Sequence, residues 1–211
     1  MSKYGYIGKD GPTQAVKSNA GVLTPKEHRD LIIADKLLIP GQLELIQTQT
    51  ITSATLVEFD LTGNYDVYFL TFNDVVLVDT KELLLRFSDD GGASFEASSY
   101  DYTNQRGDSG GTFAEVKYVG DSHITGITGN GASTNETQNG YMYFYEMLDG
   151  SKYGFMTFQS MGFDSSGNAE FCFGSGLRKV QDVYDAIQFK DSGGSGVQSC
   201  VFSLFGIKDY Y

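Results

Sequence analysis

The sequence of 211 residues has no tryptophan, three prolines, two cysteines and only 15 basic residues against 27 acidic ones. This shortage of lysine and arginine, with a formal net charge of −12, argues against a nucleic-acid partner, because clustered basic side chains bind a phosphate backbone. No apolar run approaches the roughly 20 residues of a membrane-spanning helix. Residues 1–5 also lack the apolar stretch of a secretory signal. We therefore expect synthesis in a cytoplasm, no nucleic-acid partner and no membrane insertion.

Cysteine and histidine are also too few and too scattered for a metal site. Cys172 and Cys200 lie in apolar runs, and a cytoplasmic origin favours two buried thiols over a disulfide bond. His28 and His123 have no cysteine or histidine near them in the sequence, which argues against zinc. The sequence therefore predicts neither a metal nor another cofactor.

Glycine, by contrast, is abundant at 26 residues, and 40% of the chain is hydrophobic, which together predict a packed core with many turns. From Leu43 onward hydrophobic residues alternate with a period of two, and turn signals separate the runs. About ten strands without intervening helices predict an all-β fold, an antiparallel two-sheet β-sandwich that is jelly-roll-like. The predicted strands are 43–45, 56–59, 65–72, 83–88, 112–119, 141–148, 153–161, 169–173, 183–189 and 197–207.

Two of the connections carry specific predictions. Asp149-Gly150, between two aromatic strands, predicts a tight hairpin turn because both residues tolerate positive φ. The segment 120–140 is rich in glycine, threonine, asparagine and serine, and predicts a long exposed loop. Long loops on a rigid sandwich are common places for binding.

One helix signal precedes the strands. Thr24 is a favourable N-cap, Pro25 suits the first helical position, and Glu27 completes a capping box. With Pro40-Gly41 as a stop, these residues predict a short helix over about 25–38.

This helix and the residues before it form an expected N-terminal unit. We predict an anchoring arm with a short helix at 1–40 and a β-sandwich domain at 41–211. The helix is too short to be stable alone, so its apolar side must pack on another domain or subunit. The residues expected to form the anchor are Tyr6, Val22, Leu31, Ile32 and Leu38.

Gly107-Asp108-Ser109-Gly110-Gly111 matches the nucleophile signature of chymotrypsin-like serine proteases. That chemistry needs a histidine base, but His28 lies in the predicted helix and His123 follows the serine out of the family's chain order. A surface loop is the favoured interpretation, and no catalytic residue is predicted.

A second loop, 164–170, places oxygen-bearing side chains at alternate positions, as a calcium loop does, but it serves equally as a hairpin turn. A third, Ser88-Asp89-Asp90-Gly91-Gly92-Ala93-Ser94-Phe95, resembles the Asp-box, a hairpin corner best known from sialidases. In such a corner Asp90 accepts backbone N–H bonds, Gly92 adopts an unusual φ and Phe95 fills the turn, with Ser88 at its start. We predict a structural corner.

Tyrosine gives the strongest binding signal. A tyrosine ring combines an apolar face with a hydroxyl group, which suits sugar stacking and protein interfaces. The alternative is that the members in 141–145 form one face of a strand, packed on the sandwich or on a neighbouring subunit. The candidates for binding a glycan or a partner are Tyr100, Tyr102, Tyr141, Tyr143 and Tyr145.

Several segments together resemble tailed-bacteriophage virion proteins of the aquatic-phage kind. The matching segments are QLELIQTQT at 42–50, YDVYFLTFN at 65–73, RFSDDGGASF at 86–95, AIQF at 186–189 and SLFGI at 203–207. The opening GYIG at 5–8 is similar to the N-terminal arms of those proteins. These segments are turn and strand signatures and contain no catalytic motif.

The resemblance implies a virion location, with synthesis in the host cytoplasm. It implies a non-enzymatic tail fibre or receptor-binding module that docks through its N-terminal arm on other virion proteins. It also implies self-association, commonly as a homotrimer, and contact with a host-surface glycan. The alternatives are a capsid decoration or head-fibre protein and, third, a depolymerase or serine hydrolase domain.

Overall fold

The computed structural model describes residues 24–33, 43–63, 65–127, 131 and 133–207. The chain divides into two compact units, of which Met1–Pro40 belongs to the first and Gly41–Asp209 to the second. No helix in the described part of the chain is long and apolar enough to cross a membrane.

The first unit contains helix α1 (Pro25–Ile33), which starts with the predicted capping box. The backbone N–H of Glu27 donates to Thr24 Oγ1 at 3.2 Å, and the N–H of Thr24 donates to Glu27 Oε2 at 2.8 Å. The Thr24 hydroxyl also donates to Glu27 Oε2, at 2.7 Å, and the bonds from the N–H and the hydroxyl of Thr24 lower the pKa of the exposed Glu27 carboxyl group. Leu31 is half-buried. The other expected anchor positions, Tyr6, Val22, the side chain of Ile32 and Leu38, lie outside the described residues, as does the predicted end of the helix.

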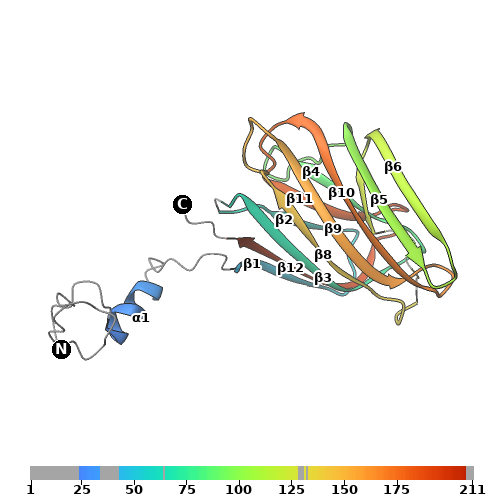
Figure 1. Cartoon of the computed structure of the whole chain (residues 1–211), viewed down its shortest axis with the longest axis horizontal. Helices are drawn as coiled ribbons and strands as arrows, with labels where there is room; N and C mark the ends of the chain where they lie inside the picture. Colours follow the sequence, from blue (N-terminus) through green and yellow to red (C-terminus); the bar gives the residue numbers. More distant parts are fainter. Residues whose placement is uncertain (1–23, 34–42, 64, 128–130, 132, 208–211) are drawn as a thin grey trace, which may run out of the picture. The chain divides into compact units, whose positions relative to one another are not determined.

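The second unit is a two-sheet antiparallel sandwich, which confirms the predicted fold class (Figure 1). The larger sheet has eight strands in the order β1-β12-β3-β8-β9-β10-β5-β6, and the smaller has four in the order β2-β11-β4-β7. The sheets are thus unequal, unlike the two four-stranded sheets of a regular jelly roll. The strands are β1 (Leu43–Ile51), β2 (Leu56–Asp60), β3 (Val67–Leu77), β4 (Leu83–Ser88), β5 (Tyr100–Asp108), β6 (Phe113–Asp121), β7 (Ile124–Ile127), β8 (Gln138–Tyr145), β9 (Tyr153–Phe163), β10 (Ala169–Gln181), β11 (Ala186–Asp191) and β12 (Val197–Ile207).

The core lies between the two sheets and is rich in aromatic residues. Phe202 of β12 stacks on Phe189 of β11 with ring centroids 5.0 Å apart, and it meets Phe59 of β2 edge-on at 6.1 Å. Phe87 of β4 meets Phe144 of β8 edge-on at 6.4 Å. These pairs bridge the sheets, and each adds stabilisation beyond that of the buried area alone. The thiols of Cys172 and Cys200 are both buried, as expected, and burial raises the pKa of the Cys200 thiol to about 12.

The structure corrects three local predictions. Residues 100–108, where no strand was predicted, form β5, and the expected loop at 120–140 contains β7 and the start of β8. Both β5 and β7 are rich in polar residues or glycine, a composition that also suits loops. β8 and β9 pair as the predicted hairpin, but its turn is longer than the two residues Asp149-Gly150. β8 ends at Tyr145 and β9 starts at Tyr153, because Glu146 turns the chain with φ 56° and buried Met147 packs into the core.

Candidate binding face

Six neighbouring strands of the large sheet, β1, β12, β3, β8, β9 and β10, share an outer face that is uncharged over four rows of residues. The exposed charged residues of these strands, Asp74 at the bulge of β3 and Lys179 near the end of β10, follow these rows in the sequence. The alternate side chains of these strands are buried against the small sheet, and the register of the ladders aligns the remaining ones. We define the outer face by these residues: Leu43, Leu45, Thr48, Thr50, Val201, Ser203, Phe205, Ile207, Val67, Phe69, Thr71, Asn73, Asn139, Tyr141, Tyr143, Tyr145, Phe155, Thr157, Gln159, Met161, Phe171, Phe173, Ser175 and Leu177.

Apolar side chains run across the outer face in register. One row joins Leu43, Ile207, Val67, Tyr145, Phe155 and Leu177, with one residue from each of the six strands. In the next row Phe69 is the centre of an aromatic group, with its ring centroid 4.7 Å from that of Tyr143 and 6.1 Å from that of Phe205. Cross-strand aromatic pairs of this kind stabilise the sheet and also form a flat platform.

Much of this surface is open to solvent. Met161 is 58% exposed and Leu45 57%, and Phe171 and Phe173 are also exposed. Six strands at about 4.8 Å and four rows at about 6.8 Å cover roughly 800 Å². An uncharged surface of this extent that is rich in aromatic side chains is typical of interaction sites.

The outer face of the small sheet shows how differently a solvated face of this chain is built. Glu58 of β2, Arg86 of β4 and Lys190 of β11 all lie on it. Gln188 Nε2 donates to Glu58 Oε1 at 2.7 Å, and Arg86 Nε donates to the carbonyl of Ser122 at 2.9 Å. The absence of charge on the large sheet is therefore a property of that one face and not of the composition.

The middle of the outer face is hollowed between β3, β8 and β9. This central hollow of about 360 Å³ is lined by Phe69, Thr71, Asn73, Asn139, Gly140, Tyr141, Gln159, Ser160 and Met161. The Tyr141 hydroxyl donates to Gln159 Oε1 at 2.8 Å, and Asn139 Oδ1 accepts from the backbone N–H of Asp74 at 3.0 Å. Aromatic rings beside fixed amides can bind a ligand that is uncharged, partly apolar and rich in hydroxyl groups.

The predicted tyrosine cluster is divided by the structure. Tyr141, Tyr143 and Tyr145 lie together along β8 on the outer face, so they form one face of a strand and are also accessible. Tyr100 and Tyr102 are buried in the sandwich, and their proposed role in binding was wrong. The Tyr100 hydroxyl accepts from the N–H of Phe87 at 2.8 Å, and burial raises the pKa of Tyr102 to about 12.

The Asp-box corner has the predicted hydrogen bonds but a different place in the fold. Asp90 Oδ1 accepts from the backbone N–H of Ser94 at 2.8 Å, Ser88 Oγ accepts from the N–H of Gly92 at 2.9 Å, and Gly92 has φ 80°. Phe95 is half-buried beside the turn. The corner is not a hairpin, because β4 pairs with β11 and β7, so the chain crosses here from the small sheet to the large one.

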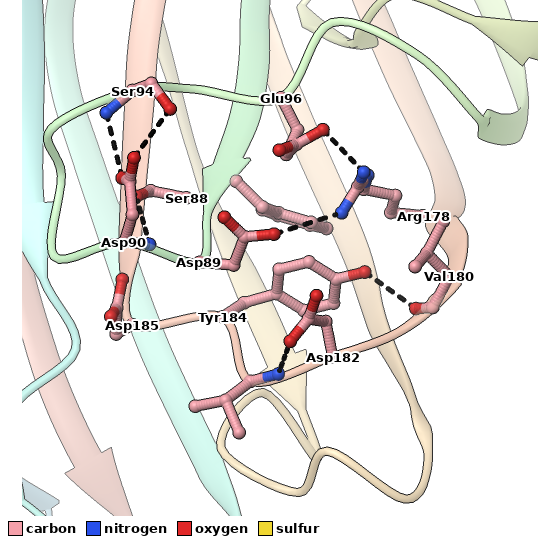
Figure 2. A network of polar contacts seen from close by, with 12 residues as sticks. Ser88, Asp89, Asp90, Ser94, Glu96, Arg178, Val180, Asp182, Tyr184 and Asp185 are labelled. Atoms are coloured by element: carbon pink, nitrogen blue, oxygen red, sulfur yellow. Dashed lines mark hydrogen bonds and ion pairs between the residues drawn. The ribbon is translucent and has the colours of Figure 1, made fainter.

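A buried charge network fixes the chain beyond this corner (Figure 2). The side chain of Arg178 is only 8% exposed, and its Nη2 lies 2.5 Å from Glu96 Oε2 while its Nη1 lies 3.7 Å from Asp89 Oδ2. The guanidinium group also sits 5.8 Å from the ring centroid of Tyr184, whose hydroxyl donates to the carbonyl of Val180 at 2.7 Å. These contacts tie the corner, the end of β10 and the segment before β11 together, so the network has a structural role.

The serine motif belongs to the turn between β5 and β6. Ser109 Oγ accepts from the N–H of Ala169 at 3.2 Å, and the N–H of Ser109 donates to the carbonyl of Ala169 at 2.9 Å. His123 Nδ1 lies 2.9 Å from Ser122 Oγ, and burial lowers the pKa of its imidazole. Within the described residues, the hydrogen bonds of Ser109 go to Ala169, and that of His123 goes to Ser122. The geometry supports the surface-loop interpretation of this motif.

The 164–170 loop is a turn between β9 and β10. The Asp164 carboxylate accepts from the backbone N–H groups of Ser166 and Asn168, both at 2.8 Å, which lowers its pKa. Within the described residues there is no group of three or more acidic, histidine or cysteine side chains that could hold a metal ion. The hairpin-turn alternative is the one that the structure supports.

Most of the outer face was missed in the sequence, including Phe69, Phe155, Met161, Phe171 and Phe173. The signal was nevertheless present, because the segments that became β3, β8, β9 and β12 are uncharged on both alternating faces over most of their length. A strand that is uncharged on both faces predicts two covered faces, not one covered and one solvated. Comparison of the chain with protein-family models, with curated proteins and with solved structures gives no match.

Proposed function

We propose that this chain is a non-enzymatic binding module of a phage virion, a tail fibre or receptor-binding protein, that binds host-surface glycan on the outer face of its large sheet. The observation that carries the binding role is the uncharged, aromatic outer face, set against the charged outer face of the small sheet. The virion setting is supported by the resemblance of its strand and corner segments to tailed-phage virion proteins.

The chemistry of the central hollow favours a neutral saccharide. Sugar rings present C–H groups that pack on aromatic faces such as those of Phe69 and Tyr141, and hydroxyl groups that bond amides such as Asn139 and Gln159. An acidic ligand is disfavoured, because none of the residues that define the outer face is a cation, Lys179 beside them is paired with Asp101 at 3.1 Å, and the chain carries a net charge of −12. The length of the outer face fits several units of a polysaccharide.

In this proposal Met1–Pro40 docks on other virion proteins, and Gly41–Asp209 contacts the host surface. The role is binding alone, so the glycan is retained and not cleaved. The resemblance also suggests that copies of the chain associate in the particle.

The test is an array of neutral and acidic bacterial polysaccharides probed with the full chain and with Tyr141→Ala. Removing this ring and its hydrogen bond to Gln159 is expected to weaken retention on neutral polysaccharides about tenfold. Leu56→Ala, a truncation of an exposed side chain on β2, is the matched control and is expected to bind as the original chain does.

Retention that is equal for all three proteins, or no retention, would overturn glycan binding by this face. A chain without glycan affinity would fit a capsid decoration or head-fibre protein better. Release of shortened saccharides would instead indicate a depolymerase.

A further inference from the structure

Strand β6 forms a free edge of the large sheet, and it is unusually apolar for such an edge (Figure 1). Phe113 is 81% exposed and Val119 is 83% exposed, the highest values among the exposed large hydrophobic residues of the described chain. Exposed edge strands of soluble proteins are normally short, charged or covered, because a long free edge can pair with another strand. β6 has nine residues, so it is not short. It combines three charged residues, Glu115, Lys117 and Asp121, with the two highly exposed apolar ones.

The backbone of β6 has one set of hydrogen-bonding groups that points away from β5. The N–H of Asp108 donates across to Thr112 at 3.0 Å, whereas the N–H of Ser109 donates to Ala169, on the β10 side, at 2.9 Å. Asp108 and Thr112 are therefore a hydrogen-bonded pair. In an antiparallel ladder hydrogen-bonded and non-hydrogen-bonded pairs alternate, so the N–H and C=O groups of the even-numbered residues of β6 point toward β5. The N–H and C=O groups of Phe113, Glu115 and Lys117 therefore point toward solvent, as do those of Val119 just before a bulge.

We propose that β6 pairs with β6 of a second copy of this chain, antiparallel about a two-fold axis at Val116. In this register Glu115 of each copy lies opposite Lys117 of the other copy. Phe113 of each copy likewise lies opposite Val119 of the other copy. All four residues are ones whose backbone groups point outward, so the hydrogen-bonding pattern and the side-chain pairing agree. Glu115 and Lys117 lie on the same face of the strand, and within one chain Lys117 Nζ is 2.5 Å from Glu115 Oε1.

Neighbouring registers of the same hydrogen-bonding pattern are disfavoured by charge. The nearest registers that keep this hydrogen-bonding pattern are shifted by two residues. One of them places Glu115 opposite Glu115 of the second copy, and the other places Lys117 opposite Lys117. Like charges directly opposite each other destabilise a strand pair. The other edge of the sheet, β1, offers no such complementarity, since Glu44 is its one charged residue and a register shift interrupts it after Leu45.

The two-fold pairing joins two eight-stranded sheets into one continuous sheet of sixteen strands. Residues opposite each other in an antiparallel pair point to the same side of the sheet. Both outer faces therefore point the same way. Phe113, whose ring lies 6.2 Å from that of Phe171, lies on this side too, beside the Glu115–Lys117 pairs at the junction. The inference is independent of the proposed function, but a dimer of this kind would be bivalent toward a polymeric ligand.

The experiment is sedimentation velocity of the full chain over a range of concentrations, compared with Glu115→Lys, Lys117→Glu and the double variant. The original chain is expected to reach twice the 23.1 kDa mass of one chain. Each single reversal places like charges opposite each other at two positions and is expected to weaken the dimer about tenfold or more. The double variant restores opposite charges and is expected to dimerise like the original, as is a mixture of the two single variants.

Glu58→Lys, on the outer face of the small sheet, changes the net charge as much as Glu115→Lys does and is expected to leave the dimer intact. Thermal unfolding of each variant establishes that it is folded. A monomer at all concentrations, a trimer, or single reversals that dimerise as tightly as the original would overturn the proposal. Failure of the double variant to recover would exclude this register, and none of these results alters monovalent glycan binding.

Discussion

At the residue scale, the carboxyl groups around the Asp-box corner have opposite titration behaviour. Burial, followed by the nearby carboxylates of Glu96 and Asp182, raises the pKa of Asp89 above its ordinary value. Hydrogen bonds from the hydroxyl and N–H of Ser94, followed by that of Ser88, lower the pKa of the neighbouring Asp90. The pKa values of two adjacent carboxyl groups in one turn therefore shift in opposite directions, because only Asp89 points toward the Arg178 network (Figure 2).

This difference predicts opposite pH dependences for two conservative substitutions. The stability that Asp89 contributes is present below its unfolded pKa and is lost as pH rises through its raised folded pKa. That of Asp90 is present above its unfolded pKa and is lost as pH falls through its lowered folded pKa. Relative to the original chain, Asp89→Asn is thus expected to gain thermal stability as pH rises above about 4, and Asp90→Asn to lose it as pH rises from about 2 to about 4. Melting temperatures measured across both ranges check both signs, and parallel curves for the three proteins would contradict the assignment.

At the element scale, local features were predictable from the sequence and partner strands were not. The capping box at Thr24 and Glu27 and the bonds of Asp90 and Gly92 involve residues at most four apart, so their residue types suffice to identify them. The Asp-box corner was expected to be a hairpin because nothing local shows that both edges of β4 are already occupied. The sequence also left open which face of β8 is buried against the core, because tyrosine occurs both in cores and on surfaces.

The close packing of β8 between its neighbours gives a second element-scale prediction. A Cβ atom added at Gly140 would lie 2.2 Å from the carbonyl oxygen of Gln159 and 2.5 Å from the ring of Phe72. Gly140→Ala is therefore expected to lower the free energy of unfolding by about 1–3 kcal/mol, as overpacked sites do. Chemical denaturation measures the change, and Thr157→Ala, on the exposed side of β9, is the control. Equal stability of Gly140→Ala and the original chain would show that the strands separate easily at this point.

At the scale of the whole molecule, different interactions stabilise each of the two units. Gly41–Asp209 has a continuous aromatic core between its sheets, and each of the buried residues that form this core belongs to it. The described part of the first unit is one nine-residue helix, which is too short to be stable by itself in water. The sandwich is therefore expected to fold without the first 40 residues.

A chain that starts at Gly41 tests this independence. It is expected to retain the melting temperature of the full chain within about 2 °C, because no core residue is removed. Under the proposed function it also keeps its polysaccharide affinity but no longer joins the virion. Loss of cooperative unfolding would show that residues 1–40 complete the core, and the anchor assignment would then be wrong.

The central claim is that the uncharged outer face of the large sheet is the binding surface, whereas the outer face of the small sheet is not. Thr157 lies on the outer face of the large sheet opposite Tyr143, and Leu56 lies exposed on the outside of the small sheet. A lysine at either position adds the same charge at an exposed strand site. The two substitutions therefore differ mainly in the face that they alter.

The most direct measurement is retention of three full-length proteins, the original chain, Thr157→Lys and Leu56→Lys, on the same array of neutral bacterial polysaccharides. The account predicts that Thr157→Lys loses retention about tenfold or more, because a solvated charge must be displaced from the middle of the binding surface, while Leu56→Lys binds as the original chain does. Equal retention of both variants, or a loss confined to Leu56→Lys, would contradict it.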